Sequence, residues 1–303
     1  MSMKITLGPV LFNWPPEIWR DFYFRIADET DVDSVCVGEV VCAKRAPFFE
    51  PFLPDVIARL QAAGKEVALS TLALISNARE EAAIAELAKT DDFLIEANDI
   101  GATDALAGRR HALGPLVNVY NEATLGFLAA RGAARVCLPP ELPAAAVAAL
   151  AAARAAEIEV LAFGRLPLAI SARCFHARAE HLHKDGCQFV CNKDADGRVV
   201  RTLGNEAFLA INGTQTLSHS AILLLSELDD LAAKGIARIR LSPHTCDMAT
   251  VADVFRAVMD HRLGAAEATR RLRAIAPDLP FSNGFYHGRA GRQQVARANS
   301  TSS

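Results

Sequence analysis

LQAAGKEVALS, the stretch at residues 60–70, joins the end of a helix to an apolar run through a single glycine. The same pattern returns as LAARGAARVCL at 128–138 and LAAKGIARIRL at 231–241. In each copy the glycine occupies the position just after a predicted helix, where a residue with left-handed backbone angles commonly ends the helix. Each apolar run is continuous rather than alternating, which is typical of a strand covered on both faces. The repeat therefore predicts helices that alternate with buried parallel strands.

Apolar runs elsewhere in the chain extend this pattern. Strands are expected near 4–8, 34–38, 66–70, 93–97, 115–119, 134–138, 157–162 and 237–241. Helices are expected between the first seven of them, at 15–28, 50–63, 78–89, 101–111, 122–131 and 141–155. Eight strands with helices between them predict a (β/α)8 TIM-barrel-like α/β fold. A doubly wound open sheet is the alternative.

The connection between the seventh and eighth strands is too long for a simple barrel. Residues 163–235 hold three of the seven cysteines and an Asp196-Gly197 pair before an apolar run, which predicts a hairpin. An insertion after a barrel strand lies on the C-terminal face, where such barrels keep their active sites. We therefore expect one barrel-like domain over 1–287. Residues 288–303 are polar and lack a pattern, so we expect a disordered tail.

Composition excludes several classes of function. The chain has 303 residues, of which 51% are hydrophobic, and a formal net charge of −3. This balance gives no support for nucleic-acid binding, and no apolar run is long enough to predict a membrane span. The N-terminal residues do not resemble a signal peptide, so we expect a cytoplasmic protein. Cysteines in a reducing compartment are more often ligands, nucleophiles or core residues than disulfides.

The cysteines gather in SARCFHARAEHLHKDGCQFVC, residues 171–191. Twelve residues separate Cys174 from Cys187, and three separate Cys187 from Cys191. On an extended strand the last two would lie about 13 Å apart, but on a helical turn only about 6 Å. If both bind one centre, the segment GCQFVC must form a turn.

A tetrahedral or cubane site generally needs a fourth ligand. Cys36 and Cys137 lie within predicted strands, so we expect both in the core. Cys246 follows the last strand and remains a candidate. Cys42 follows the second strand, in a loop on the same face as the insertion, and is the favoured fourth ligand.

The residues alone leave four interpretations of this segment open. Nearby arginine and lysine favour thiolates and would offset the negative charge of an iron–sulfur cluster. Zinc, often bound by histidine together with cysteine, is a second interpretation. A redox or nucleophilic cysteine and an incidental polar loop are the others. The motifs G-x-S-x-G and H-E-x-x-H and the phosphate-binding glycine loops are absent, so no hydrolytic triad has local support.

Four segments resemble the collagenase-like peptidase family, whose name reflects an early assignment rather than a shared peptidase chemistry. They are GEVVCAKR (38–45), GRLPLAISARCFHARAEHLHKDGCQFVC (164–191), INGTQTLS (211–218) and RLSPHTCDM (240–248). The similarity covers about residues 1–285 and is strongest to members that act in ubiquinone biosynthesis. It implies a [4Fe–4S] cluster held by Cys42, Cys174, Cys187 and Cys191. It also implies a heterodimer with a paralogue that carries its own cluster.

The resemblance further implies oxygen-independent hydroxylation of the ring of a quinone precursor, with prephenate implicated as the hydroxyl source. Other members hydroxylate RNA bases, which is one alternative function. A non-catalytic scaffold subunit that holds zinc or an iron–sulfur cluster is another.

Five further residues are candidates for contacts with substrate or with the metal ligands. Glu39 could orient the loop of Cys42 or be a solvated acid. Arg173 could be a cation beside the site, and His176 could shuttle protons, although both could also simply lie at the surface. Asn118 and Tyr120 are expected at the end of the fifth strand, facing the barrel mouth.

Overall fold

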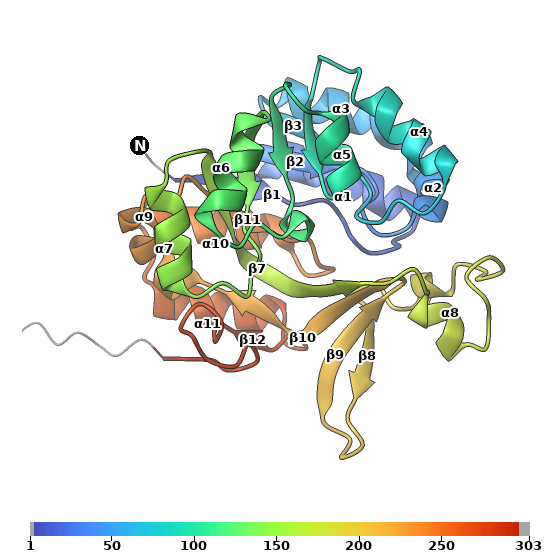
Figure 1. The fold of residues 1–303 in the computed structure, drawn as a ribbon. Helices are drawn as coiled ribbons and strands as arrows, with labels where there is room; N and C mark the ends of the chain where they lie inside the picture. Colours follow the sequence, from blue (N-terminus) through green and yellow to red (C-terminus); the bar gives the residue numbers. More distant parts are fainter. Residues whose placement is uncertain (1–2, 297–303) are drawn as a thin grey trace, which may run out of the picture.

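The structure, a computed structural model, describes residues 3–296. Its centre is a closed barrel of parallel strands, in which β11 pairs with both β1 and β7 (Figure 1). The barrel strands are β1 (Lys4–Leu7), β2 (Ser34–Val37), β3 (Glu66–Ser70), β4 (Leu94–Ala97), β5 (His111–Leu113), β6 (Ala133–Cys137), β7 (Glu157–Ile170) and β11 (Arg238–Leu241). The predicted (β/α)8 fold is confirmed, and the open sheet is excluded because the ring closes.

Helices connect the strands and cover the outside of the barrel. The longer ones are α1 (Pro16–Glu29), α3 (Leu53–Ala62), α4 (Ala78–Leu87), α5 (Ile100–Ala105), α6 (Glu122–Ala130), α7 (Ala144–Ala152), α9 (Leu228–Ala233), α10 (Met248–Met259) and α11 (Ala265–Ile275). Short turns of helix are η1 (Ala43–Arg45), α2 (Ala46–Phe49), η2 (Glu50–Phe52), η3 (Pro115–Val117), α8 (Phe175–Ala179), η4 (Val190–Lys193) and η5 (Leu225–Glu227). Within residues 3–296, no helix is both long and apolar enough to cross a membrane.

The fifth strand lies earlier than the sequence predicts. We expected residues 115–119, but the strand is β5 at His111–Leu113, and Pro115–Val117 form η3. Proline has no N–H to donate to a central strand, so the apolar run that begins at Pro115 cannot pair on both sides. The preceding helix, expected over 101–111, accordingly ends at Ala105.

The seventh strand is longer than predicted and forms part of the insertion. Up to Phe163, β7 pairs with β11 in the barrel, and beyond it pairs with the antiparallel strand β10 (Gln215–Leu223). Strands β8 (Arg198–Arg201) and β9 (Ala207–Asn212) extend this sheet as a hairpin that projects from the barrel in Figure 1. The insertion is thus built on a continuous barrel strand.

The hairpin turn also differs from the prediction. The Asp196-Gly197 pair precedes β8, and the turn lies at residues 202–206. The side chain of Asp196 instead accepts a hydrogen bond from the backbone N–H of Thr245, at 3.0 Å. This aspartate therefore ties the start of the hairpin to the loop after β11.

The C-terminal end is described only in part. A short strand, β12 (Phe281–Ser282), pairs with β10. Residues 288–296, which we assigned to a disordered tail, follow it, and Val295 exchanges hydrogen bonds with the side chain of Asn283 at 2.7 and 3.0 Å. This part of the chain is therefore hydrogen-bonded to the segment that follows β12. The rest of the predicted tail, 297–303, lies outside the described residues.

Gly164 marks the point where β7 leaves the barrel. Its φ is +119°, and a β-carbon there would lie 2.6 Å from the Cβ of Ser242. We expect Gly164→Ala to lower the free energy of unfolding by about 2 kcal/mol or more, from strain and overpacking together. Urea denaturation measures this. Gly126→Ala, on α6, is the control. A β-carbon there would have no heavy atom within 4 Å among the described residues outside its own helix, so this variant should be neutral or slightly stabilising. Equal stability of the two variants would contradict the interpretation.

Candidate metal centre

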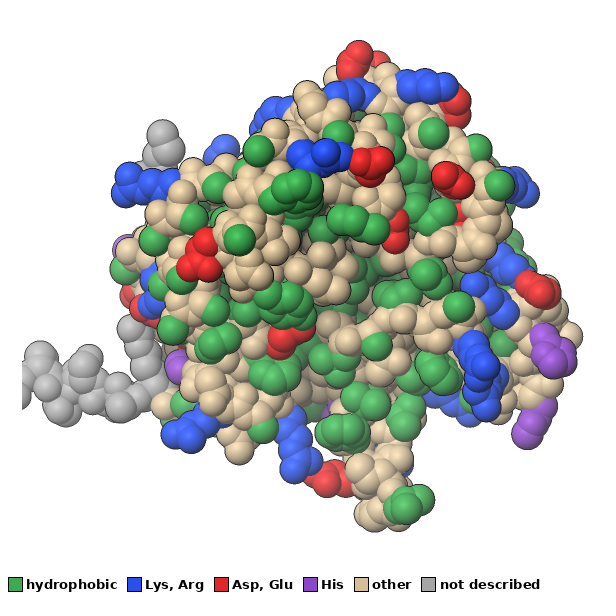
Figure 2. All heavy atoms as spheres, in the orientation of Figure 1, with side chains coloured by type: hydrophobic (Ala, Val, Ile, Leu, Met, Phe, Trp, Pro, Cys, Tyr) green, Lys and Arg blue, Asp and Glu red, His purple; other side chains and the backbone are tan. Residues whose placement is uncertain are grey.

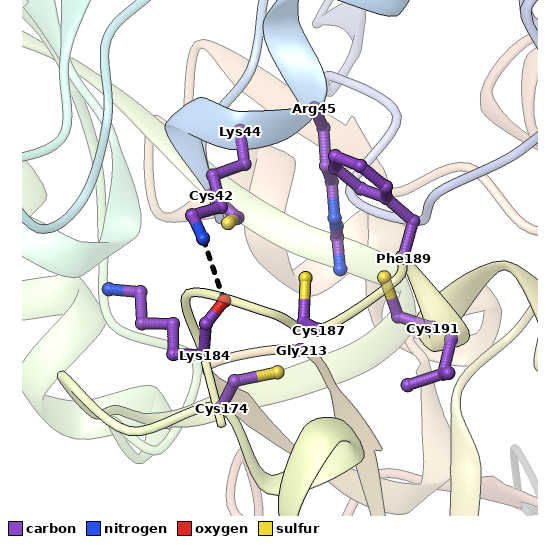
Figure 3. A pocket seen from close by; sticks show the side chains of 10 residues that line it. Cys42, Lys44, Arg45, Cys174, Lys184, Cys187, Phe189, Cys191 and Gly213 are labelled. Carbon is purple, nitrogen blue, oxygen red and sulfur yellow. Dashed lines mark hydrogen bonds between the residues drawn. The ribbon is translucent and has the colours of Figure 1, made fainter. Parts of the chain in front are cut away.

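Four cysteines from separate segments line one cavity. Cys42 lies at the N-cap of η1, Cys174 at the N-cap of α8, Cys187 in the following loop and Cys191 in η4. The cavity has about 340 Å³ of empty space, part of it open to solvent. Figure 3 shows the four cysteine side chains grouped around the guanidinium of Arg45. The structure therefore brings the early cysteine of the barrel to the three cysteines of the insertion.

The segment between Cys187 and Cys191 forms the turn that their spacing requires. Gln188 and Phe189 both take left-handed backbone angles, with φ of +50° and +53°, and the N–H of Val190 donates to the carbonyl of Cys187 at 3.2 Å. Each non-glycine residue in this conformation costs about 1–2 kcal/mol. The contact of the Phe189 ring with Phe48, at 4.7 Å between centroids, helps to hold the turn against α2.

Glu39 organises the loop that carries Cys42. Its carboxylate accepts the backbone N–H groups of Val41 and Cys42, at 2.7 and 2.9 Å. Burial raises the pKa of this carboxyl, and the nearby Arg45 partly opposes the shift. Of our two alternatives for Glu39, the structure shows the one that orients the cysteine loop.

Arg45 is the cation at the centre of the site, and the sequence indicated it only as a charge beside Cys42. Its side chain is buried, with the residue only 1% exposed. The guanidinium donates to the carbonyl of Leu11 at 2.8 Å and to the side-chain oxygen of Asn212 at 2.9 Å. Burial acts to lower its pKa, but the carboxylate of Glu39 and the thiolate forms of Cys191 and Cys42 raise it above the ordinary value. Arg45 therefore remains charged and connects the barrel loops to the insertion.

Close packing around Arg45 requires a glycine in the turn between β9 and β10. Gly213 has a φ of +62°, and a β-carbon there would lie 2.6 Å from a terminal nitrogen of Arg45. Next to it, Thr214 donates its hydroxyl to the carbonyl of Val41 at 2.9 Å. This turn forms one wall of the cysteine cavity.

The thiols and the lysines around them define the charge of the cavity. Burial raises the pKa of the Cys42 and Cys174 thiols, so both are neutral without a metal at pH 7. The ammonium of Lys44 donates to the carbonyls of Lys184 and Asp185, at 2.7 and 3.0 Å. Lys44, Lys184 and Arg45 thus place positive charge where thiolates bound to a metal would place negative charge.

His176 is buried, so the alternative that it simply lies at the surface is wrong. The N–H of Gly213 donates to its Nδ1 at 2.8 Å, and its Nε2 lies 3.1 Å from a carboxylate oxygen of Asp194. Burial lowers its pKa, with Asp194 opposing. The neutral ring therefore carries its proton on Nε2 and fastens α8 to the β9–β10 turn. The other histidines of the segment, His181 and His183, are exposed, and Figure 2 shows purple and blue side chains gathered over this insertion.

Three other predicted contacts lie away from the cavity. Arg173 is exposed beside Cys174 and does not line the cavity. Asn118 is exposed after η3. The hydroxyl of the half-exposed Tyr120 donates to Glu141, and burial together with this hydrogen bond raises the pKa of Tyr120 to about 12. Asn118 and Tyr120 do not end the fifth strand as expected, because β5 stops at Leu113, and neither residue lines the cysteine cavity.

The remaining cysteines do not reach the cavity. Cys36 and Cys137 are buried inside the barrel, as expected, and the sulfur of Cys246 lies 3.8 Å from that of Met248 after β11. Among residues 3–296, no three histidine, cysteine or acidic side chains converge closely enough to hold a single metal ion.

Comparison with known proteins identifies the family. Residues 23–296 match the sequence profile of peptidase family U32. The chain belongs to peptidase family U32. Similar solved structures include the U32 peptidase Mk0906, at 12% identity and a TM-score of 0.45, covering 80% of this chain and 94% of that one. Dihydropteroate synthase from Thermus thermophilus has 14% identity and a TM-score of 0.40, covering 90% of this chain and 94% of that one. The evidence for the barrel in this U32 chain is the pairing of its own strands, which closes the ring through β11.

Arg45→Met tests the role of the buried cation. It removes two charge-assisted hydrogen bonds while keeping most of the side-chain volume, so the free energy of unfolding should fall by about 2–4 kcal/mol. Limited proteolysis should also cleave residues 171–201 faster, because the insertion loses its attachment to the barrel. Arg173→Met, at an exposed position in the same segment, is the matched control and should change neither property. Unchanged cleavage in Arg45→Met would contradict this role.

Proposed function

We propose that this chain is an iron–sulfur subunit of an oxygen-independent hydroxylase that acts on the ring of a ubiquinone precursor. In this role it would be similar to the ubiquinone biosynthesis protein UbiV. The observation that supports the proposal is the cavity in which Cys42 meets Cys174, Cys187 and Cys191. The sequence resemblance assigns these same four positions to a cluster.

The chemistry of the cavity fits a [4Fe–4S] cluster better than a zinc ion. In a cubane each cysteine binds a different iron, so the sulfurs need to surround a volume rather than converge on one point. A single zinc ion needs converging ligands, and the described residues do not supply three. Arg45, Lys44 and Lys184 line the same cavity and would offset the negative charge of four thiolates. When bound, such a cluster would supply electron transfer.

The protein's own residues would prepare this site. Glu39 holds the Cys42 loop through two backbone N–H groups, and His176 holds α8 against the β9–β10 turn. Both contacts hold the segments that carry the cysteines in place. The proposed partner is a UbiU-like paralogue in a cytoplasmic heterodimer, and the proposed small molecules are a quinone precursor and prephenate. These assignments rest on the sequence resemblance.

Metal analysis of anaerobically purified protein tests the cofactor. We expect a brown protein with about four irons and four sulfides per chain. Cys42→Ser and Cys187→Ser should lose most of the iron, because each removes one thiolate ligand. Cys246→Ser is the matched control, since this half-buried cysteine lies outside the cavity. A colourless protein with one zinc per chain would contradict the proposal.

Genetic complementation tests the reaction. A strain that lacks this gene should lose the quinone under anaerobic growth and keep its hydroxylated RNA bases, as measured by mass spectrometry. Cys246→Ser should restore the quinone, whereas Cys174→Ser should not. Loss of RNA hydroxylation with an intact quinone pool would favour the RNA-modifying alternative. Tagged protein should also co-purify with the UbiU-like paralogue, with iron and sulfide found in both subunits.

A further inference from the structure

A second cavity lies at the mouth of the barrel, apart from the cysteines. It has about 420 Å³ of empty space, part of it open to solvent. Its walls come from the C-terminal ends of several barrel strands and from β10, which is where TIM barrels bind their small molecules. Much of the lining is apolar, from residues Pro9, Leu11, Val40, Pro115, Leu116, Leu161 and Pro167.

Arg165 is a buried cation in the wall of this cavity. The residue is 6% exposed, and its guanidinium donates to three backbone carbonyls, two of them at 3.1 Å, those of Asp196 and Ser218. The third is that of His219. Carbonyl groups satisfy N–H donors but do not neutralise the charge. Burial lowers the pKa of Arg165, with only Asp196 opposing.

The nearby acidic side chains are bound to other partners. The carboxylate of Asp196 accepts from the backbone N–H and hydroxyl of Thr245. Glu96 is the acid among the described residues that line the cavity, and both its oxygens are engaged, one by Arg240 and the other by Ser70 and Asn98. Arg165 has no carboxylate in ion-pair contact among residues 3–296. A buried charge without a counter-ion is costly, which points to a partner that comes from outside.

Gln215 provides an independent indication of a ligand. It is fully buried in the same wall, and its side-chain oxygen accepts from Asn212 at 3.2 Å. Its Nε2 has no hydrogen-bond partner among residues 3–296. An unsatisfied buried donor costs about 1–3 kcal/mol, so this amide also lacks an acceptor that a ligand could supply.

We propose that the barrel mouth binds a small molecule with an apolar body and one carboxylate, which Arg165 and Gln215 hold from the same wall. A single negative charge fits best, since one guanidinium is available and Glu96 would repel a dianion such as phosphate. The apolar lining accommodates a ring or short hydrocarbon body. That this ligand is the substrate rests on the proposed function, whereas binding itself requires no metal.

Calorimetric titration of the full-length protein with sodium benzoate tests this site. Benzamide is the uncharged probe of the same shape, and inorganic phosphate is the dianionic one. We expect benzoate to bind and the other two to bind at least about tenfold more weakly, because each lacks a single carboxylate charge. Equal binding of benzamide, or tighter binding of phosphate, would overturn the proposal.

Two variants locate the binding. Arg165→Met should raise the Kd of benzoate about ten- to a hundredfold, the effect of losing a charge-assisted hydrogen bond. Gln215→Glu keeps the shape of the side chain but adds a negative charge to the same wall, so it should weaken benzoate binding to a similar extent. This second variant tests the site independently if Arg165→Met fails to fold. Arg270→Met, on the surface of α11, is the control and should leave the Kd unchanged. Unaltered binding in a folded Gln215→Glu variant would overturn the proposal.

These measurements separate this inference from the proposed function. A colourless, zinc-containing protein that still binds benzoate through Arg165 would contradict the iron–sulfur proposal and support the carboxylate site. A brown protein with about four irons that does not bind benzoate would support the iron–sulfur proposal and contradict the carboxylate site.

Discussion

The candidate site depends on the burial of one cation, the guanidinium of Arg45. A buried charge is costly unless opposite charge and hydrogen-bond acceptors lie close by. Arg45 has the carboxylate of Glu39 nearby and donates to groups from distant parts of the chain, the carbonyl of Leu11 and the amide oxygen of Asn212. Its Nε has no hydrogen-bond partner among residues 3–296. The position of Arg45 therefore fixes the insertion relative to the barrel. The cysteine cavity is the space that remains between these two parts, and its thiols surround the same cation.

Much of the barrel could be predicted from local sequence, because each strand that is covered on both faces is a continuous apolar run. The predicted strands β5 and β7 differ from the observed ones because the local composition does not show whether a segment can pair, or with which partner. Residues 115–119 are more apolar than His111–Leu113, yet Pro115 cannot pair on both sides and the shorter segment forms β5. The extension of β7 beyond Phe163 depends on pairing with β10, some fifty residues later in the chain. No local pattern encodes such a partner.

At the cysteine site, too, features that depend on neighbouring residues could be predicted, whereas contacts between distant segments could not. The turn between Cys187 and Cys191 followed from their spacing, since an extended segment would separate the sulfurs too far. The roles of Arg45 and His176 could not be predicted, because both contact residues 212–213 in another part of the insertion. The sequence did point to these two regions, because GEVVCAKR (38–45) and INGTQTLS (211–218) are both among the segments that resemble the collagenase-like peptidase family. Their contact in space became evident only from the structure.

The turn from Asn212 to Gln215 separates the two cavities and connects them chemically. Asn212 accepts from Arg45 at 2.9 Å on the cysteine side and donates to Gln215 at 3.2 Å on the barrel-mouth side. Each group in this chain of hydrogen bonds is buried, so its polarisation is screened little by water. The segment INGTQT (211–216) therefore forms a wall that the cysteine cavity shares with the cavity at the barrel mouth, because Gly213 lines the first and Gln215 lines the second.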